Sequence, residues 1–365
     1  MQIKSLSLTN FKNIGSADLE FSSKVNCFVG DNGMGKSNLL DAIHYLSFCR
    51  SFSGMTDRQL IRQGEPFLTA RAVYQRGSAE EELTLGIAGP QRKSLKRNGK
   101  EYRRITEHIG LYPLVMVSPA DIDMARGGAE ERRRWLDMVL SQGDAAYLDA
   151  LVRYHRGLEQ RNRMLRDHVV DHTLYEAVEI PMAMAATQVY ERRKKRIAEL
   201  DNILTTLYPA IAGEAEQASL EYESVLNGAA FEEIIESTRR HDEILGHTSR
   251  GPHRDDIVMK INDMPIRRAG SQGQCKTFTV ALRLAQFRFL QESTGLKPLL
   301  LLDDVFDKLD AGRVERILEL VGSNDFGQIF VTDTNRAHID RIIHRAGGDH
   351  RLWYVAGGAF TPAQA

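Results

Sequence analysis

The segment VNCFVGDNGMGKSNLLDAIHYL, residues 25–46, has the residue types and spacing needed to hold phosphate groups. It fits the pattern G-x-x-x-x-G-K-[ST], with a buried strand before the loop and an amphipathic helix after it. The glycines let backbone N–H groups curl around β- and γ-phosphates, Lys36 adds a positive charge, and Ser37 offers a hydroxyl to Mg²⁺. We therefore predict a nucleoside triphosphate site, with Lys36 also acting in catalysis. The predicted loop contacts are Gly30, Asp31, Asn32, Gly33, Met34, Gly35, Lys36, Ser37 and Asn38.

A second acidic motif, PLLLLDDVFDKLD at 298–310, supplies the other half of such a site. The leucine run suits a buried parallel strand, and Asp303 and Asp304 stand at its carboxyl end, where ligands bind in these sheets. We predict that Asp303 joins Ser37 in the Mg²⁺ shell and that Asp304 is catalytic, because it could orient or deprotonate the attacking water. Acidic residues in this position can also simply begin a solvent-exposed loop.

The stretch GSQGQCK at 270–276 precedes a long helical pattern and has the composition of a helix start. Ser271 is a good N-cap, whereas Gly273 in the first turn costs about 1 kcal/mol relative to alanine. Uncapped N–H groups and the positive end of the helix dipole would suit an anion, phosphate above all. On these residues alone, an ordinary capped helix remains the alternative.

The order of strand and helix patterns along the sequence predicts the fold class. Strand patterns fill residues 1 to about 113, long charged helical patterns fill about 120 to 245, and strands alternate with helices again afterwards. Hairpin turns are expected at Asn98–Gly99 and at the Asn-Asp pair within RDDIVMKINDMPIRR. Pro181 is expected to start a helix and Pro209 to stop one. We predict an α/β domain built from two separated segments that carries an inserted, mostly helical lobe.

Composition limits the class of protein. The 365 residues are 42% hydrophobic and 27% charged, with a net charge of −1, so any nucleic-acid surface must be a local patch. The three cysteines, Cys27, Cys49 and Cys275, form no metal-binding spacing, which favours a reduced, cytoplasmic protein. The N-terminus lacks the apolar core of a signal peptide, and no apolar run approaches the roughly 20 residues of a membrane span. We expect no membrane association.

Taken together, these motifs resemble the ABC-type ATPase heads of the SMC and RecF families, and the RecF family most closely. The resemblance covers nearly the whole chain. It rests on LSLTNFKNIGSADLEF, GDNGMGKSNLLDAIHYLS, VSPADIDMARGGAEERRRWLD, RGPHRDD, AGSQGQCKT and LLLLDDVFDKLD. It implies an ATPase head with a mixed sheet and a phosphate-loop core. The implied division is 1–115 and 251–365 for the two halves of the head and 116–250 for the helical lobe.

The resemblance also implies a composite site. Two heads of this kind pair face to face on binding ATP, so the chain would be a homodimer. Ser271, Gln272, Gly273 and Gln274 would then cap the γ-phosphate that Lys36 of the other copy holds. The segment Leu309–Asp310 would cross the dimer seam. NFKN at 10–13 matches a segment near the nucleotide, which adds Lys12 and Asn13 to the expected contacts.

The function implied by the resemblance is that of an ATP-dependent DNA-binding clamp in recombinational repair, replication and the SOS response. Its implied partners are gapped or duplex DNA read with little sequence specificity, mediators of the RecR and RecO type, and a RecA-type recombinase. Asp304 stands where most such heads have glutamate, so we expect weak, DNA-stimulated hydrolysis of ATP. The ATPase subunit of a membrane transporter and a small-molecule kinase are the alternatives.

Basic runs offer candidate DNA contacts, although charge runs are more often solvated faces. They lie at 92–100, at 132–134 and at 192–196, and the sequence does not choose among them. His253, beside Asp255 and Asp256, could suggest a metal site. A structural turn is the favoured interpretation, since no second suitable histidine is evident.

Overall fold

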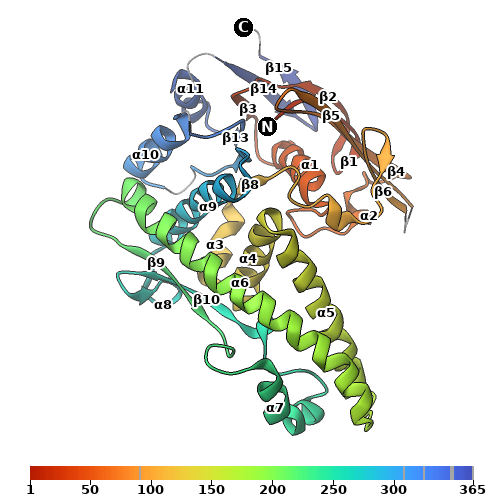
Figure 1. The fold of residues 1–365 in the computed structure, drawn as a ribbon. Coiled ribbons are helices and arrows are strands. Elements are labelled where there is room, and N and C mark those ends of the chain that lie inside the picture. Colours follow the sequence, from red (N-terminus) through yellow and green to blue (C-terminus); the bar gives the residue numbers. More distant parts are fainter. Residues whose placement is uncertain (90–91, 307–308, 324, 346–348, 364–365) are drawn as a thin grey trace. The chain divides into compact units, whose positions relative to one another are not determined.

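The fold divides into two compact units, and one of them is built from both ends of the chain (Figure 1). Unit 1 contains Met1–Asp121 and Leu282–Ala365, and unit 2 contains Ile122–Ala281. The predicted α/β fold assembled from separated segments is therefore confirmed, whereas the finer division at 115 and 250 stays a prediction. The computed structural model describes residues 1–89, 92–306, 309–323, 325–345 and 349–363.

An antiparallel sheet forms one part of unit 1. Its strands, in the order β2-β1-β4-β5-β6-β7, are β2 (Ile14–Glu20), β1 (Gln2–Phe11), β4 (Phe67–Arg76), β5 (Ala79–Ala88), β6 (Arg92–Arg97) and β7 (Lys100–Glu101). Buried residues alternate with less buried ones along β4 and β5, as expected for a sheet with one face on the core. Asn98 and Gly99 have φ of 50° and 76°, so the predicted hairpin turn is confirmed.

A mixed sheet forms the other part of unit 1 and carries the predicted nucleotide motifs. In spatial order its strands are β15 (Ala359–Pro362), β14 (His350–Ala356), β3 (Val25–Val29), β13 (Ile329–Asp333), β12 (Leu299–Asp303) and β8 (Leu114–Val117). The last five run parallel, and β15 runs antiparallel to β14. Because parallel strands point the same way, the carboxyl ends of β3, β13 and β12 lie side by side at one edge.

Helices cover this mixed sheet. The helices of unit 1 are α1 (Lys36–Phe48), α2 (Asp57–Leu60), α10 (Ala311–Gly322), α11 (Arg336–Arg345) and the second half of α9 (Gln272–Thr294), with 3₁₀ turns at Ile105–Glu107 and Pro119–Asp121. α1 packs on β8, β12 and β13, and α11 packs on β3 and β13. Every residue of β3, β8, β12 and β13 is buried, which explains their almost uninterrupted apolar sequences.

Unit 2 is mostly helical, with one small antiparallel sheet in the order β11-β10-β9. Its elements are α3 (Ile122–Arg126), α4 (Ala129–Gly143), α5 (Ala145–Arg166), α6 (His172–Ala212), β9 (Ala218–Glu223), α7 (Phe231–Leu245), a 3₁₀ turn at Pro252–Arg254, β10 (Asp256–Ile261), β11 (Met264–Pro265), α8 (Ile266–Ala269) and the start of α9. Asn262 and Asp263 join β10 to β11 with φ of 48° and 62°, which confirms the second predicted hairpin turn.

The long helix α6 corrects two expectations. Pro181 does not start a helix and Pro209 does not stop one, because both lie inside α6. The helix begins instead at Asp171, whose side chain accepts a hydrogen bond from the Thr173 N–H at 2.9 Å. Burial of apolar side chains along the whole of α6 offsets the cost of about 3 kcal/mol for an internal proline. Among the described residues, no helix combines the length and apolar character needed to cross a membrane.

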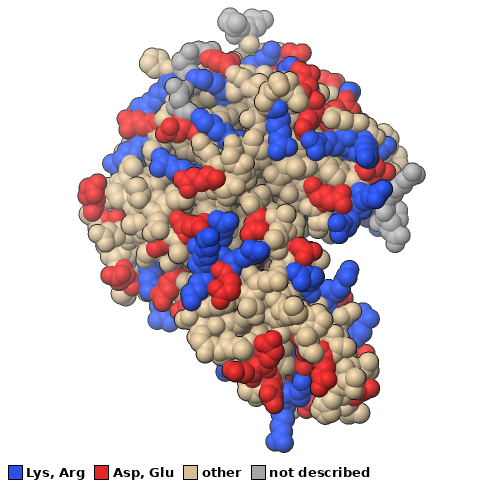
Figure 2. All heavy atoms as spheres, viewed as in Figure 1, with Lys and Arg blue, Asp and Glu red and all other residues tan. Residues whose placement is uncertain are grey.

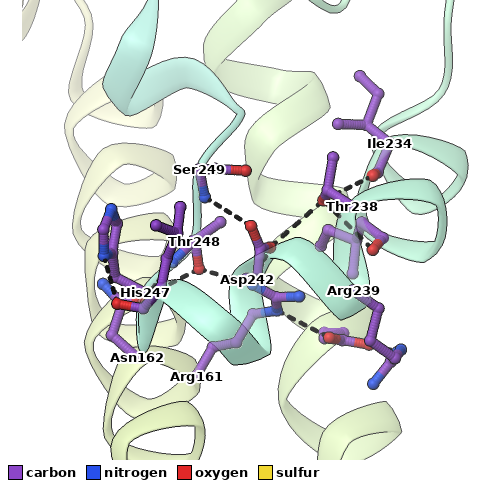
Figure 3. A network of polar contacts seen from close by, with 12 residues as sticks. Arg161, Asn162, Ile234, Thr238, Arg239, Asp242, His247, Thr248 and Ser249 are labelled. Atoms are coloured by element: carbon purple, nitrogen blue, oxygen red, sulfur yellow. Dashed lines mark hydrogen bonds and ion pairs between the residues drawn. The ribbon is translucent and has the colours of Figure 1, made fainter.

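A buried arginine joins the helices of unit 2 (Figure 3). Arg161 on α5 is fully buried and donates to Glu179 on α6 and to Asp242 on α7, each at 2.8 Å. It also donates to the Thr248 hydroxyl at 2.8 Å, and Arg239 pairs with the second oxygen of Glu179. Each buried charge is therefore met by an opposite charge within the same unit.

Candidate nucleotide-binding site

The predicted phosphate loop connects β3 to α1 and is shaped by its glycines. A Cβ atom on Gly30 would lie 2.2 Å from the carbonyl oxygen of Val355, so only glycine fits beside β14. Gly35 has φ of 112°, a left-handed conformation that other residues rarely adopt. Since Gly35 stands at the N-cap and has no side chain, the first N–H groups of α1 stay available to an anion.

Lys36 folds back over this loop rather than pointing to solvent. The residue is 3% exposed, and its ammonium donates to the carbonyl oxygens of Gly30 at 2.7 Å and Asp31 at 3.0 Å. Two neighbouring turns support the loop from outside, since the Gly358 N–H donates to the Met34 carbonyl and the Asn13 side chain lies against Gly35. The positive charge is thus held within the curve of the loop.

The two predicted Mg²⁺ ligands come together although they are far apart in sequence. The Ser37 hydroxyl donates to Asp303 at 2.8 Å, and the same carboxylate oxygen accepts from the Thr332 hydroxyl at 2.6 Å. Burial raises the pKa of the Asp303 carboxyl above its usual value, while the two hydroxyl donors and the Lys36 charge oppose that shift. A buried carboxylate and a hydroxyl are oxygen ligands of the kind that Mg²⁺ prefers, so these residues fit the ion.

Thr332 is a site residue that the sequence interpretation missed. It lies on β13, next to Asp303 in the register with β12, and its hydroxyl orients that carboxylate. The signal was present in the segment VTDT, where a hydroxyl residue follows an apolar run one position before the strand end. Its relevance depends on the β12–β13 pairing, which local patterns do not specify.

Asp304 begins the loop after β12, with φ of 44° and its N–H donating to Thr332 at 3.2 Å. It lines a cleft of about 610 Å³ together with Asn32 of the phosphate loop. The other described lining residues are Pro119, Phe306, Leu309, Ala311, Val314, Asp333, Thr334, Asn335, His338 and Arg341. Thus the structure places the predicted catalytic carboxylate and the phosphate loop at one cleft.

Lys12 and Asn13 have different surroundings. The Asn13 side chain accepts from Asn38 at 2.8 Å, which keeps it at the start of α1 beside the phosphate loop. The Lys12 ammonium instead pairs with the buried Asp41 at 2.5 Å and donates to the Ser53 hydroxyl. The charge of Lys12 is therefore already balanced inside unit 1, and its contact with a nucleotide stays a prediction.

The segment Ser271–Gln274 belongs to unit 2 and starts α9 as a capping box. The Gln274 N–H donates to the Ser271 hydroxyl at 3.1 Å, and the Ser271 N–H donates to the Gln274 side chain at 2.9 Å. Ser271 and Gln272 are exposed, and Gly273 is half-buried. The N-cap prediction is confirmed, and the role of this segment toward a second copy stays a prediction.

The basic runs differ in how their charges are used. Arg132 forms a bidentate pair with Asp256, Arg134 pairs with Glu130, and Arg193 is buried against Asp137 and Asp255. On the face shown in Figure 2, Lys and Arg side chains lie among Asp and Glu. Lys96 and Lys100 in the run 92–100 are exposed, as are Lys194 and Lys195 in the run 192–196, and no ion pair of these four lysines is found within the described part of the chain.

His253 has a structural role, as favoured from the sequence. Its Nδ1 lies 2.6 Å from the Tyr154 hydroxyl, and its Nε2 lies 3.0 Å from the Thr248 carbonyl. Both ring nitrogens are used within unit 2. Among the described residues, no group of three or more His, Cys, Asp or Glu side chains could hold a metal ion.

A phosphate loop and an acidic strand end on one mixed sheet, with an antiparallel sheet in the same unit, define the class of ABC-type ATPase heads. The model of the family described as "RecF/RecN/SMC N terminal domain" matches residues 2–347. A protein from Parabacteroides distasonis named "DNA replication and repair protein RecF" is 48% identical, with all of both chains covered. A Porphyromonas gingivalis protein of the same name is 47% identical over 98% of this chain and 99% of its own. The chain belongs to the RecF family.

Solved structures agree with this assignment. The chain superposes with a TM-score of 0.88 on the structure described as "recombination mediator protein RecF-ATP in RecFOR pathway", at 28% identity over 99% of each chain. A second structure, described as "recombination mediator protein RecF-ATPrS in RecFOR pathway", gives a TM-score of 0.89 at 28% identity, covering 100% of this chain and 98% of that one. An SMC head bound to a ScpA domain gives a TM-score of 0.59 at 16% identity, over 100% and 97%, which shows the fold alone.

Proposed function

We propose that this chain is an ATP-binding, slowly hydrolysing clamp that acts on DNA in recombinational repair and replication. The observation that carries the proposal is the bond from Ser37 to Asp303 beside Lys36, at the mouth of the glycine loop. The RecF names of its relatives support the DNA repair function, and the relative described with ATP supports the nucleotide. A transporter ATPase is not favoured, because the matched relatives are DNA repair proteins over their full lengths.

The residues of unit 1 have distinct parts in the proposed reaction. The loop N–H groups and Lys36 bind the phosphates, and Thr332 fixes the Asp303 carboxylate against Ser37. Mg²⁺, held by Ser37 and Asp303, would stabilise negative charge that develops on the phosphate oxygens. Asp304 accepts a proton from the attacking water or orients that water toward the γ-phosphorus. Its side chain is one methylene shorter than glutamate, which fits slow turnover.

The proposed dimer uses the capped start of α9. The Ser271 oxygen accepts a bond from the Gln274 N–H, and a hydroxyl that accepts in this way can still donate its own hydrogen. That hydrogen could reach a γ-phosphate held by the partner copy, with the N–H groups of Gln272 and Gly273 beside it. Leu309 and Asp310 would lie at the seam. ATP would then join two copies, and hydrolysis would release them.

DNA and mediator proteins are the proposed partners. Lys96 and Lys100 are our candidates for phosphate contacts, since they are the exposed lysines of the basic run. The relatives described as recombination mediators in the RecFOR pathway support partners of the RecR and RecO type. We also propose a RecA-type recombinase, loaded at gapped DNA, because the resemblance to the RecF family implies it. We place the protein in the cytoplasm, as favoured by three buried cysteines that each remain a thiol.

The proposal is tested by measuring ATP hydrolysis with and without gapped duplex DNA in the parental chain and in Asp304→Asn. The variant should bind Mg·ATP with similar affinity and hydrolyse it about 10- to 100-fold more slowly, because the proton acceptor is gone. It should also accumulate as an ATP-bound dimer on DNA. Asp325→Asn, an exposed aspartate of the same unit, serves as the control. A parental chain that fails to bind ATP would overturn the proposal.

A further inference from the structure

A glycine turn near the end of the chain lies against the outside of the phosphate loop. Gly357 and Gly358, with φ of 56° and 82°, join β14 to β15, and β14 pairs in parallel with β3, the strand that leads into the loop. The Gly358 N–H donates to the Met34 carbonyl at 2.8 Å. A Cβ atom on Gly358 would lie 2.5 Å from the Asn13 carbonyl oxygen. The turn is therefore packed closely between the phosphate loop and the β1–β2 turn.

The bond from Gly358 fixes the direction of one peptide unit of the phosphate loop. Because a peptide unit is planar and trans, the Met34 carbonyl and the Gly35 N–H point in opposite directions. The carbonyl points to Gly358, so the Gly35 N–H points away from the C-terminal turn. Among the described residues, this N–H has no hydrogen-bond partner. It is therefore available to a phosphate, since loops of this pattern bind phosphates through backbone N–H groups.

We propose that the β14–β15 turn is a positioning element for the nucleotide. The Gly358 N–H holds the Met34–Gly35 peptide in the orientation that presents the Gly35 N–H to a phosphate. This inference rests on the proposed function, because it assumes that the phosphate loop binds a nucleotide. The turn acts through the loop rather than by contact with the nucleotide. Its contribution to affinity is preorganisation, since a loop already held in its binding shape loses less conformational freedom when the nucleotide binds.

The competing explanation is that the two glycines only close a hairpin. Another hairpin of unit 1 shows what closure alone requires. There, Asn98 and Gly99 have φ of 50° and 76°, and a Cβ atom on Gly99 would meet no neighbouring atom within 4 Å. Gly357 resembles Gly99, since a Cβ atom on it would also meet no neighbouring atom within 4 Å. Gly358 differs by its close approach to Asn13 and by its bond to the phosphate loop, and a hairpin needs neither.

The first test compares Gly358→Ala with Gly357→Ala in the full-length chain. Both changes place alanine at a positive φ, so their direct cost in stability should be similar, and melting temperatures show whether both variants are folded. Gly358→Ala should weaken binding of Mg·ADP and Mg·AMP-PNP about 10-fold each, because its Cβ atom displaces the turn and a hydrogen bond to a charged phosphate is lost. Gly357→Ala should leave both dissociation constants unchanged. Equal affinities in the two folded variants would overturn the inference.

The second test uses the parental chain and therefore serves even if Gly358→Ala does not fold. Because linkage is reciprocal, a turn that strengthens nucleotide binding is itself stabilised by the nucleotide. Hydrogen exchange of the Gly358 amide should slow several-fold when Mg·ADP binds. The Asn98 amide, which donates to the Glu82 carbonyl in the other hairpin, should exchange at an unchanged rate. An unchanged rate at Gly358, or equal slowing of both amides, would show that the turn is only structural. A parental chain that binds no nucleotide would instead refute the proposed function.

Discussion

Two buried carboxylates, Asp303 in unit 1 and Asp242 in unit 2, show how a candidate site differs from a structural network. Asp303 accepts from two neutral hydroxyls, those of Ser37 and Thr332. Asp242 instead meets the guanidinium of Arg161 at 2.8 Å, and both side chains are fully buried. Asp303 is paired with no cation among the residues that the structure describes, whereas the charge of Asp242 is neutralised by Arg161. The type of partner, more than burial, separates the two roles.

The same distinction applies to the basic runs. Arg132 and Arg193 are matched by carboxylates inside unit 2, so their charges stabilise the fold rather than attract a ligand. Lys96 and Lys100 are exposed and remain candidates for an external partner. In the sequence these runs look alike. Substitutions of charges that are already paired should therefore change stability, and substitutions of available charges should change binding.

The largest effect is expected from Arg161→Ala. Removing this cation leaves Asp242 buried without its partner, which should lower the free energy of unfolding by about 3–5 kcal/mol. Arg134→Ala is the matched control, because Arg134 is exposed and forms an i,i+4 pair worth at most about 0.5 kcal/mol. Urea denaturation measures the free energy of unfolding of both variants. Equal, small losses in the two variants would show that the buried network does not stabilise unit 2.

Acid should weaken the fold through buried histidines. Burial lowers the pKa of His44 and His108 in unit 1 and of His253 in unit 2 to about 4. The unfolded chain, with histidine pKa values near 6.5, then binds more protons than the folded chain between about pH 6.5 and 4. The free energy of unfolding should therefore fall as pH falls through this range, by up to about 3 kcal/mol for each histidine.

Urea denaturation at pH 7.0, 5.5 and 4.5 measures this fall. His253→Gln should show a shallower decline than the parental chain, since one titrating group is removed. A decline of unchanged steepness in that variant would mean that His253 is already charged in the fold. His344→Gln, which alters an exposed histidine, is the control that should follow the parental curve.

A smaller effect is expected on DNA binding. Lys96→Glu combined with Lys100→Glu should weaken DNA binding about 10-fold at low salt and make it less salt-dependent, because two phosphate contacts are lost. Arg134→Glu changes charge at an exposed arginine that already has a carboxylate partner, and should have less effect. Fluorescence anisotropy with gapped duplex DNA at several salt concentrations measures the DNA affinity of both variants. If Arg134→Glu weakens DNA binding more than the double lysine variant does, the DNA contact lies in unit 2 instead.

The phosphate loop could be predicted from the sequence because Gly30, Gly35, Lys36 and Ser37 are local neighbours with a fixed spacing. Asp303 could be matched to them despite a separation of 266 residues, since a leucine-rich strand with an acidic end is itself recognisable. Thr332 could not, because its relevance arises only from the pairing of β13 with β12.

The ion-pair partners of buried arginines could not be predicted from the sequence either. Nothing in the run around Arg161 indicates that this arginine is buried while Arg153, eight positions earlier on the same helix, is exposed and pairs with Asp149. Pro181 and Pro209 were misinterpreted for a related reason, since the burial of α6 overrides the local cost of proline. Contacts between segments far apart in the sequence determine which arginines are buried and where a long helix ends. A single sequence does not show these contacts.

The central claim is that unit 1 binds ATP and that Ser271 serves the nucleotide of a second copy. Its most direct test mixes Ser271→Arg with Lys36→Met and measures molar mass and ATP hydrolysis in the presence of gapped DNA. Each variant alone should stay monomeric and inactive. The mixture should form dimers and partly recover hydrolysis, because one of its two sites combines an intact Lys36 with an intact Ser271. A mixture of folded variants that recovers neither dimer nor hydrolysis would contradict the account.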